Sequence, residues 1–100
     1  MPYTIDYAES VSEDLADLRA YKRMSILDTI EEHLLHEPTQ QTRNRKILVG
    51  LVPPWEHVVP VWELCIGEYR VFYDVDEDTA VVTIRAIRRK PSHKTTEEVL

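Results

Sequence analysis

WELCIGEYRVFYDV, from Trp62 to Val75, is the stretch of sequence that decides the fold. Its aromatic and branched residues alternate with polar ones on either side of Gly67-Glu68, which predicts two antiparallel strands joined by a two-residue turn. Residues of such a hairpin pair in order away from the turn. The pairs put six side chains on one apolar face, which we expect to meet the core: Ile66 with Tyr69, Leu64 with Val71 and Trp62 with Tyr73.

The opposite face of this hairpin collects charged side chains, because successive strand residues point to opposite sides of a sheet. It carries Glu63, Cys65, Arg70 and Phe72. Two interpretations of this face remain open. One is an outer sheet surface with ordinary ion pairs. The other is a phosphate site, since neighbouring arginines repel one another unless a carboxylate or an anion lies between them.

A third strand is predicted after the acidic turn Asp76-Glu77-Asp78, because Thr79 to Ile87 is again rich in β-forming residues. Closing this turn at Glu77-Asp78 pairs Arg70 with Arg85 and Phe72 with Thr83. The alternation then assigns the rest of the strand: Ile87 and Arg89 to the charged face, and Val82, Ile84 and Ala86 to the core.

The N-terminal part of the chain predicts one strand and two helices. Tyr3 to Tyr7 alternates in the manner of a strand, and Ser10 with Glu13 forms a capping box at the start of a helix. Apolar residues at helical spacing then continue to Glu37-Pro38, where proline disfavours further helix. We expect the break between the two helices from Tyr21 to Ser25.

The middle of the chain predicts a short strand, a loop and the strand that enters the hairpin. These are Lys46 to Val49, the proline-rich Pro53 to His57, and Val58 to Ile66. Trp55, inside the loop, either packs locally or contacts a partner. We therefore expect one α+β domain over residues 1–100, with an N-terminal strand, a two-helix hairpin, and an antiparallel sheet of three to four strands covered by helices on one face.

The C-terminal residues 91–100 are left open between a flexible tail and an ordered segment. Thr95-Thr96-Glu97-Glu98 has the pattern of a helix cap, which favours a short terminal helix. Terminal residues without buried contacts are, however, commonly mobile.

Composition narrows the class of protein. One hundred residues with 43% hydrophobic content suit a single core, and neither a signal peptide nor a transmembrane run is apparent, so a cytoplasmic protein that does not enter membranes is expected. The lone Cys65 cannot form an internal disulfide. The net charge of −6 argues against general nucleic-acid binding. Only Arg85 to Lys94 is locally basic, either as a solvated edge or as a contact for RNA or a partner protein.

The hairpin resembles the RelE/ParE family of bacterial toxins, in which a strand and a glycine turn precede a Tyr-Arg-x-x-Tyr strand, here Tyr69 to Tyr73. The resemblance covers nearly the whole chain, including a last strand that ends in Arg88-Arg89-Lys90. It implies that the chain is the toxin of a type II toxin–antitoxin system and that a cognate antitoxin neutralises it. The toxin would form a homodimer by itself or a heterotetramer with the antitoxin. RelE-like members cleave messenger RNA on the ribosome, and ParE-like members inhibit DNA gyrase.

The resemblance also implies roles for individual residues. Arg70 matches the transition-state arginine of the family, and Arg89 matches the second arginine near the leaving group. RelE-like toxins often carry two basic residues where this chain has Glu63 and Cys65, so Glu63 is the candidate base and His93 the candidate acid. The expected RNA contacts are Arg85, Arg88, Lys90 and Phe72. No cofactor or metal is implied, and the departures leave open a member of low toxicity that acts only as a binding protein.

Overall fold

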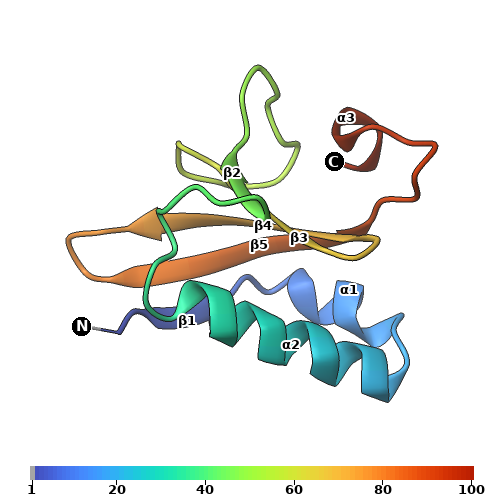
Figure 1. Ribbon diagram of the computed structural model, residues 1–100, viewed down its shortest axis with the longest axis horizontal. Helices are drawn as coiled ribbons and strands as arrows, with labels where there is room; N and C mark the ends of the chain where they lie inside the picture. The colour runs from blue at the N-terminus through green and yellow to red at the C-terminus, as the bar shows by residue number, and fades with distance from the viewer. Residues whose placement is uncertain (1) are drawn as a thin grey trace.

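The chain forms one five-stranded sheet, seen in the computed structural model that describes residues 2–100 (Figure 1). In chain order the elements are β1 (Thr4–Tyr7), α1 (Val11–Ala16), α2 (Ala20–Leu34), β2 (Arg45–Ile47), β3 (Trp62–Ile66), β4 (Tyr69–Asp76), β5 (Val81–Arg89) and α3 (Thr96–Val99). The strand order is β1-β5-β4-β3-β2, with β1 parallel to β5 and the other pairs antiparallel. The expected α+β class is confirmed.

The two faces of the sheet are covered differently (Figure 1). We call the side that carries α1 and α2 the helix face. We call the other side, which carries α3 and the loop between β2 and β3, the loop face. Within residues 2–100, no helix has the length and apolar composition needed to cross a membrane.

The main core lies between α2 and the helix face. Three residues of α2, Ile26, Ile30 and Leu34, are fully buried against the β3–β4 hairpin. Each such side chain contributes roughly 1.5–3 kcal/mol by leaving water. The predicted hairpin register is confirmed in all three pairs that define its apolar face, Ile66–Tyr69, Leu64–Val71 and Trp62–Tyr73. Gly67 adopts the positive φ, 56°, that this turn requires.

The predicted register between β4 and β5 is wrong, first because Asp76 pairs with Val81, so the turn spans residues 77–80 instead of closing at Glu77-Asp78. Phe72 pairs with Ala86 and Tyr73 with Ile84, so Arg85 is an extra residue that forms a bulge in β5. The bulge exchanges the faces of all later residues. Arg70 is therefore opposite Arg88 instead of Arg85, and Phe72 is opposite Ala86 instead of Thr83. Ala86 lies on the loop face, whereas Ile87 and Arg89 lie on the helix face.

The helix predictions also need two corrections. The Ser10 side chain makes no capping hydrogen bond, and the helical break lies at residues 17–19, before the predicted Tyr21–Ser25. Arg23 accounts for the earlier break, because its guanidinium donates to the carbonyls of Leu15 and Leu18 at 3.1 and 3.0 Å. The Leu18 carbonyl gains a donor in this way, and the Leu15 carbonyl also accepts from the Leu18 amide at 3.1 Å where α1 ends.

The free edge of β5 is closed by α1. β1 pairs with β5 only as far as Ile84, so the later backbone groups of β5 lack a strand on that side. The Asp14 carboxylate accepts a hydrogen bond from the Ile87 amide at 3.0 Å and one from the Arg88 guanidinium at 2.8 Å. This carboxylate ties α1 to the sheet where β1 has ended.

The connection from α2 to β2 is held by two buried polar side chains. Arg45 donates to the carbonyls of His33 and Gln40, which satisfies the C-terminal end of α2. The Tyr73 hydroxyl donates to the Pro38 carbonyl at 2.7 Å. Burial raises the pKa of Tyr73, so the hydroxyl stays protonated and remains a donor.

Replacing Tyr73 with phenylalanine should lower the free energy of unfolding by about 1–2 kcal/mol, because the buried Pro38 carbonyl loses its donor while the ring packing remains. Urea denaturation followed by circular dichroism measures the change. Tyr21→Phe is the matched control, since Tyr21 is 69% exposed and should shift the midpoint very little. Equal midpoints for the two variants would show that the Pro38 contact adds no stability.

Candidate active site

The loop face holds a fully buried carboxylate between two cations. Glu63 is 1% exposed, and its Oε1 lies 3.5 Å from the Lys46 Nζ, while its Oε2 lies 4.0 Å from the Arg70 Nε. Thr96 donates its hydroxyl to Oε2 at 3.0 Å. Three adjacent strands and α3 therefore supply one polar cluster, in which Lys46 faces Glu63 directly across the β2–β3 pair.

The hydrogen bonding of Glu63 is incomplete. Its Oε1 receives no hydrogen bond from any group in residues 2–100, although Lys46 lies within ion-pair distance. A buried carboxylate is costly unless its charge is compensated, and polar groups left in this state are frequent at functional sites. The arrangement therefore makes Glu63 a candidate for proton transfer.

Arg70 is held in place beside the turn. Its Nη1 donates to the carbonyls of Gly67 and Tyr69 at 2.8 and 2.9 Å, and its side chain is mostly buried. These bonds fix the guanidinium at the end of the β3–β4 hairpin, on the same face as Glu63. It is a positioned cation whose attraction for an anion needs little reorganisation.

An aromatic cluster adjoins this polar group. The rings of Trp55 and Phe72 lie 5.3 Å apart, and the Arg88 guanidinium lies 5.2 Å from the Trp55 ring. Leu100 packs against the same cluster. Trp55, for which the sequence left two interpretations, thus packs within the domain.

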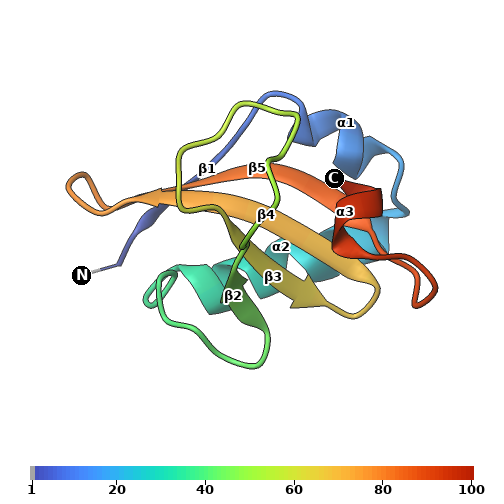
Figure 2. The same ribbon diagram turned by 90° about the horizontal axis from the view of Figure 1, so that it is seen from above.

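The C-terminal segment closes the site. Residues 95–100 form α3 and its caps, and Figure 2 shows this helix lying over the sheet, near the ends of β4 and β5. The expected capping box is present, since Thr95 accepts from the Glu98 amide and Glu98 accepts from the Thr95 amide. The backbone hydrogen bond from Thr95 holds the pKa of the Glu98 carboxyl below its usual range.

The remaining predicted site residues do not join Glu63 and Arg70. Arg89 lies on the helix face and pairs with Glu68 at 3.2 Å, because of the bulge at Arg85. Arg85 pairs with Asp74 at 2.8 Å. His93 is exposed in the turn before α3, and Lys90 continues the chain beyond β5. The expectation that Arg70 and Arg89 share a face is wrong.

Lys46 was missed in the sequence. It belongs to the site because β2 pairs with β3, and this pairing follows a loop of fourteen residues, 48–61, whose length hides the register. In the sequence, the only indication of this role was a short apolar strand that contains one lysine.

Replacing Thr95 with alanine should loosen α3 by about 1 kcal/mol, because the cap that satisfies the Glu98 amide is lost. Amide exchange at Glu98 should then accelerate roughly fivefold. The Glu98 pKa is lower in the folded state than in the unfolded chain. The carboxylate therefore stabilises α3 above its usual pKa of 4.5, and this stabilisation is lost as pH falls through the lower folded value.

The matched control is Ser92→Ala, in the same exposed turn, which should leave exchange unchanged. An unaltered protection factor at Glu98, in the Thr95 variant or in wild-type protein brought to acid pH, would contradict a role for this cap in holding α3.

Comparison with known proteins gives one family and several related structures. A family model described as the ParE toxin of type II toxin–antitoxin systems, parDE, matches residues 5–91. No curated protein sequence matches the chain. The solved structures that match the chain have low sequence identity to it, so the likeness shows a shared fold.

Three of these structures cover nearly all of the chain. A chain of the RelBE2 toxin–antitoxin complex from Mycobacterium tuberculosis has a TM-score of 0.70 at 21% identity, covering 90% of this chain and 100% of that one. A chain of the RelE–RelB complex from Pyrococcus horikoshii has 0.62 at 22%, covering 92% and 99%. The isolated RelE toxin of E. coli has 0.65 at 18%, covering 94% and 88%.

Proposed function

This chain belongs to the ParE toxin family of type II toxin–antitoxin systems, and we propose that it cleaves messenger RNA on the ribosome and that a cognate antitoxin neutralises it. Several of the structures that share its fold are toxin–antitoxin complexes, which supports the antitoxin as a partner. The observation that carries the nuclease proposal is the buried Glu63 carboxylate between Lys46 and Arg70.

The chemistry follows from these three side chains. Glu63 accepts the proton of a ribose 2′-hydroxyl, whose oxygen attacks the adjacent phosphorus and forms a cyclic phosphate as the bond to the 5′-oxygen breaks. Arg70 and Lys46 stabilise the negative charge that develops on the phosphoryl oxygens. The departing 5′-oxygen takes a proton from water, because His93 is exposed in the turn before α3, outside the Glu63–Arg70 cluster. Arg89, on the helix face, is left out of this mechanism.

The site must open before RNA can bind. Glu63 and Phe72 are both inaccessible beneath the C-terminal segment, so Thr96 and Leu100 have to leave the loop face. Their departure uncovers the Phe72 and Trp55 rings beside the cations. Aromatic faces of this kind stack unpaired nucleobases, which is how proteins commonly hold single-stranded RNA.

The charge of the chain favours action on the ribosome over action on free RNA. The net charge is −6, and Arg85, Arg88 and Arg89 each pair with a carboxylate of the chain. Affinity for RNA comes largely from uncompensated lysine and arginine side chains. Messenger RNA that is already held by the ribosome does not depend on such affinity.

Glu63→Gln should reduce cleavage by about 10²–10⁴-fold, because glutamine keeps the shape of the side chain but cannot act as the base. Arg70→Ala should reduce it by roughly 10²–10³-fold. The measurement is induction without antitoxin, with mapping of new 5′ ends in cellular messenger RNA. Exposed Glu56→Gln and Arg43→Ala are the controls, and circular dichroism verifies the fold of each variant.

Two outcomes would overturn the nuclease proposal. Growth arrest with intact transcripts would show that toxicity has another cause, and normal growth on strong induction would indicate a member of low toxicity that acts through binding.

A second candidate function is inhibition of DNA gyrase, favoured by the same pairing of Arg85, Arg88 and Arg89 with carboxylates, since a protein target does not need an uncompensated basic face. Under the nuclease proposal, supercoiling by purified gyrase should continue unchanged with toxin at about 1 μM, a concentration at which specific protein complexes commonly form. Loss of supercoiling at that concentration would assign the toxin to gyrase instead.

A further inference from the structure

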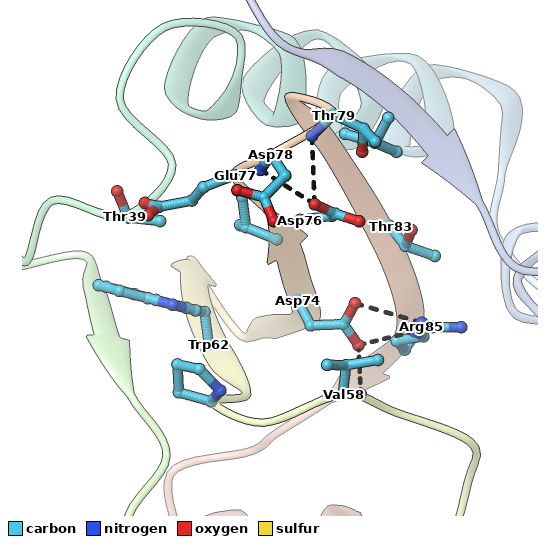
Figure 3. A pocket seen from close by; sticks show the side chains of 13 residues that line it. Thr39, Val58, Trp62, Asp74, Asp76, Glu77, Asp78, Thr79, Thr83 and Arg85 are labelled. Carbon is cyan, nitrogen blue, oxygen red and sulfur yellow. Dashed lines mark hydrogen bonds and ion pairs between the residues drawn. The ribbon is translucent and has the colours of Figure 1, made fainter.

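A cavity lies on the loop face at the end of the sheet formed by the β4–β5 hairpin (Figure 3). Its volume is about 730 Å³. One wall is the hairpin, and the other is the segment that leads into β3. This cleft is separate from the Glu63 site, because the Trp55–Phe72 cluster lies between Arg70, at one end of β4, and Asp76, at the other.

The floor of the cleft contains an internally neutralised ion pair. The Asp74 carboxylate accepts from the Arg85 Nε at 2.8 Å and from its second nitrogen, Nη2, at 3.2 Å (Figure 3). It also accepts from the Val58 amide at 2.9 Å, which ties the loop wall to the sheet. The charge of Arg85 is thereby neutralised by Asp74, so it does not compensate the negative charge at the mouth of the cleft.

The mouth of the cleft is acidic and uncompensated. Asp76, Glu77 and Asp78 are consecutive, exposed and line the cavity. Asp76 uses one carboxylate oxygen to accept from the amides of Asp78 and Thr79. In the described part of the chain, residues 2–100, no lysine, arginine or histidine forms an ion pair with any of the three.

The opposite wall is apolar and open to water. Val58, which is 57% exposed, and the exposed Pro60 line this wall. Single exposed valines are ordinary on protein surfaces. Here Val58 and Pro60 line a cavity whose other side carries uncompensated charge, so the cleft presents an aliphatic wall and an acidic wall to the same occupant.

We propose that this cleft binds a segment of the cognate antitoxin that combines lysine or arginine side chains with aliphatic ones; the proposal rests on the toxin–antitoxin assignment above. Charge complementarity selects this occupant. Nucleic acid and anionic membranes would bring negative charge against Asp76, Glu77 and Asp78. A basic segment gains attraction on that wall and buries its aliphatic side chains against Val58 and Pro60.

The test uses the protein encoded by the small reading frame beside the toxin gene, purified and titrated calorimetrically into the full-length chain. The Glu77→Lys/Asp78→Lys variant should bind it at least about tenfold more weakly, because two attractive charges become repulsive. The wild-type affinity should fall as salt rises, and the fall should be smaller for the variant. Val58→Ser, on the apolar wall, should weaken binding without changing the salt dependence.

The matched control is Asp28→Lys/Glu32→Lys on α2, which makes the same change in net charge on exposed residues elsewhere. Equal losses in the two double variants, or an affinity in the Glu77/Asp78 variant within twofold of wild type, would overturn the proposal for the cleft while the toxin–antitoxin pair stands. Absence of binding by the wild-type chain would overturn both. Messenger cleavage by the wild-type chain is measured separately, so failure of the nuclease activity does not count against the cleft.

Discussion

Arg85 is the residue of β5 that has no partner in β4, since Phe72 pairs with Ala86 and Tyr73 with Ile84. Both faces of the sheet depend on this bulge. Before it, Val82 and Ile84 face the core. After it, Ile87 takes over that role, while Ala86 joins Phe72 on the loop face. The bulge brings Arg85 onto Asp74, and it turns Arg89 away from Arg70. A bulge of this kind re-aims side chains at the cost of one ladder position.

The same contacts that stabilise Glu63 also close its site. A buried carboxylate loses several kcal/mol of hydration, which Lys46, Arg70 and the Thr96 hydroxyl partly offset. Thr96 belongs to a helix of four residues that is attached through its capping box, Leu100 and this one side-chain contact. Few buried contacts hold it, so it is among the segments expected to open at low free-energy cost.

Charge is distributed over the loop face in two separate regions. Near α3, cations surround one carboxylate, whereas the β4–β5 turn carries three carboxylates without a cation from the described chain. The apolar Trp55–Phe72 cluster separates them. If the chain is a nuclease as proposed, its acidic surface requires that RNA be delivered by another assembly. If the acidic cleft binds the antitoxin as proposed, the attraction comes from basic residues of that partner.

The sequence by itself determined the features that depend on near neighbours. Gly67-Glu68 set the register of β3 against β4, helical spacing of apolar residues predicted two helices before Glu37-Pro38, and Thr95 with Glu98 predicted the terminal cap. The Tyr69 to Tyr73 pattern supplied the family resemblance, and with it Glu63 and Arg70 as candidates. Only the tertiary structure decided which of the other residues join them. Lys46 reaches Glu63 across a long loop, Asp14 reaches Arg88 from α1, and one unpaired residue moves Arg89 to the other face. Sequence periodicity assigns side chains to the two faces by counting residues along one strand. A bulge shifts that assignment, and a pairing between distant strands adds residues to a face. Both depend on interactions that form only when the elements pack together.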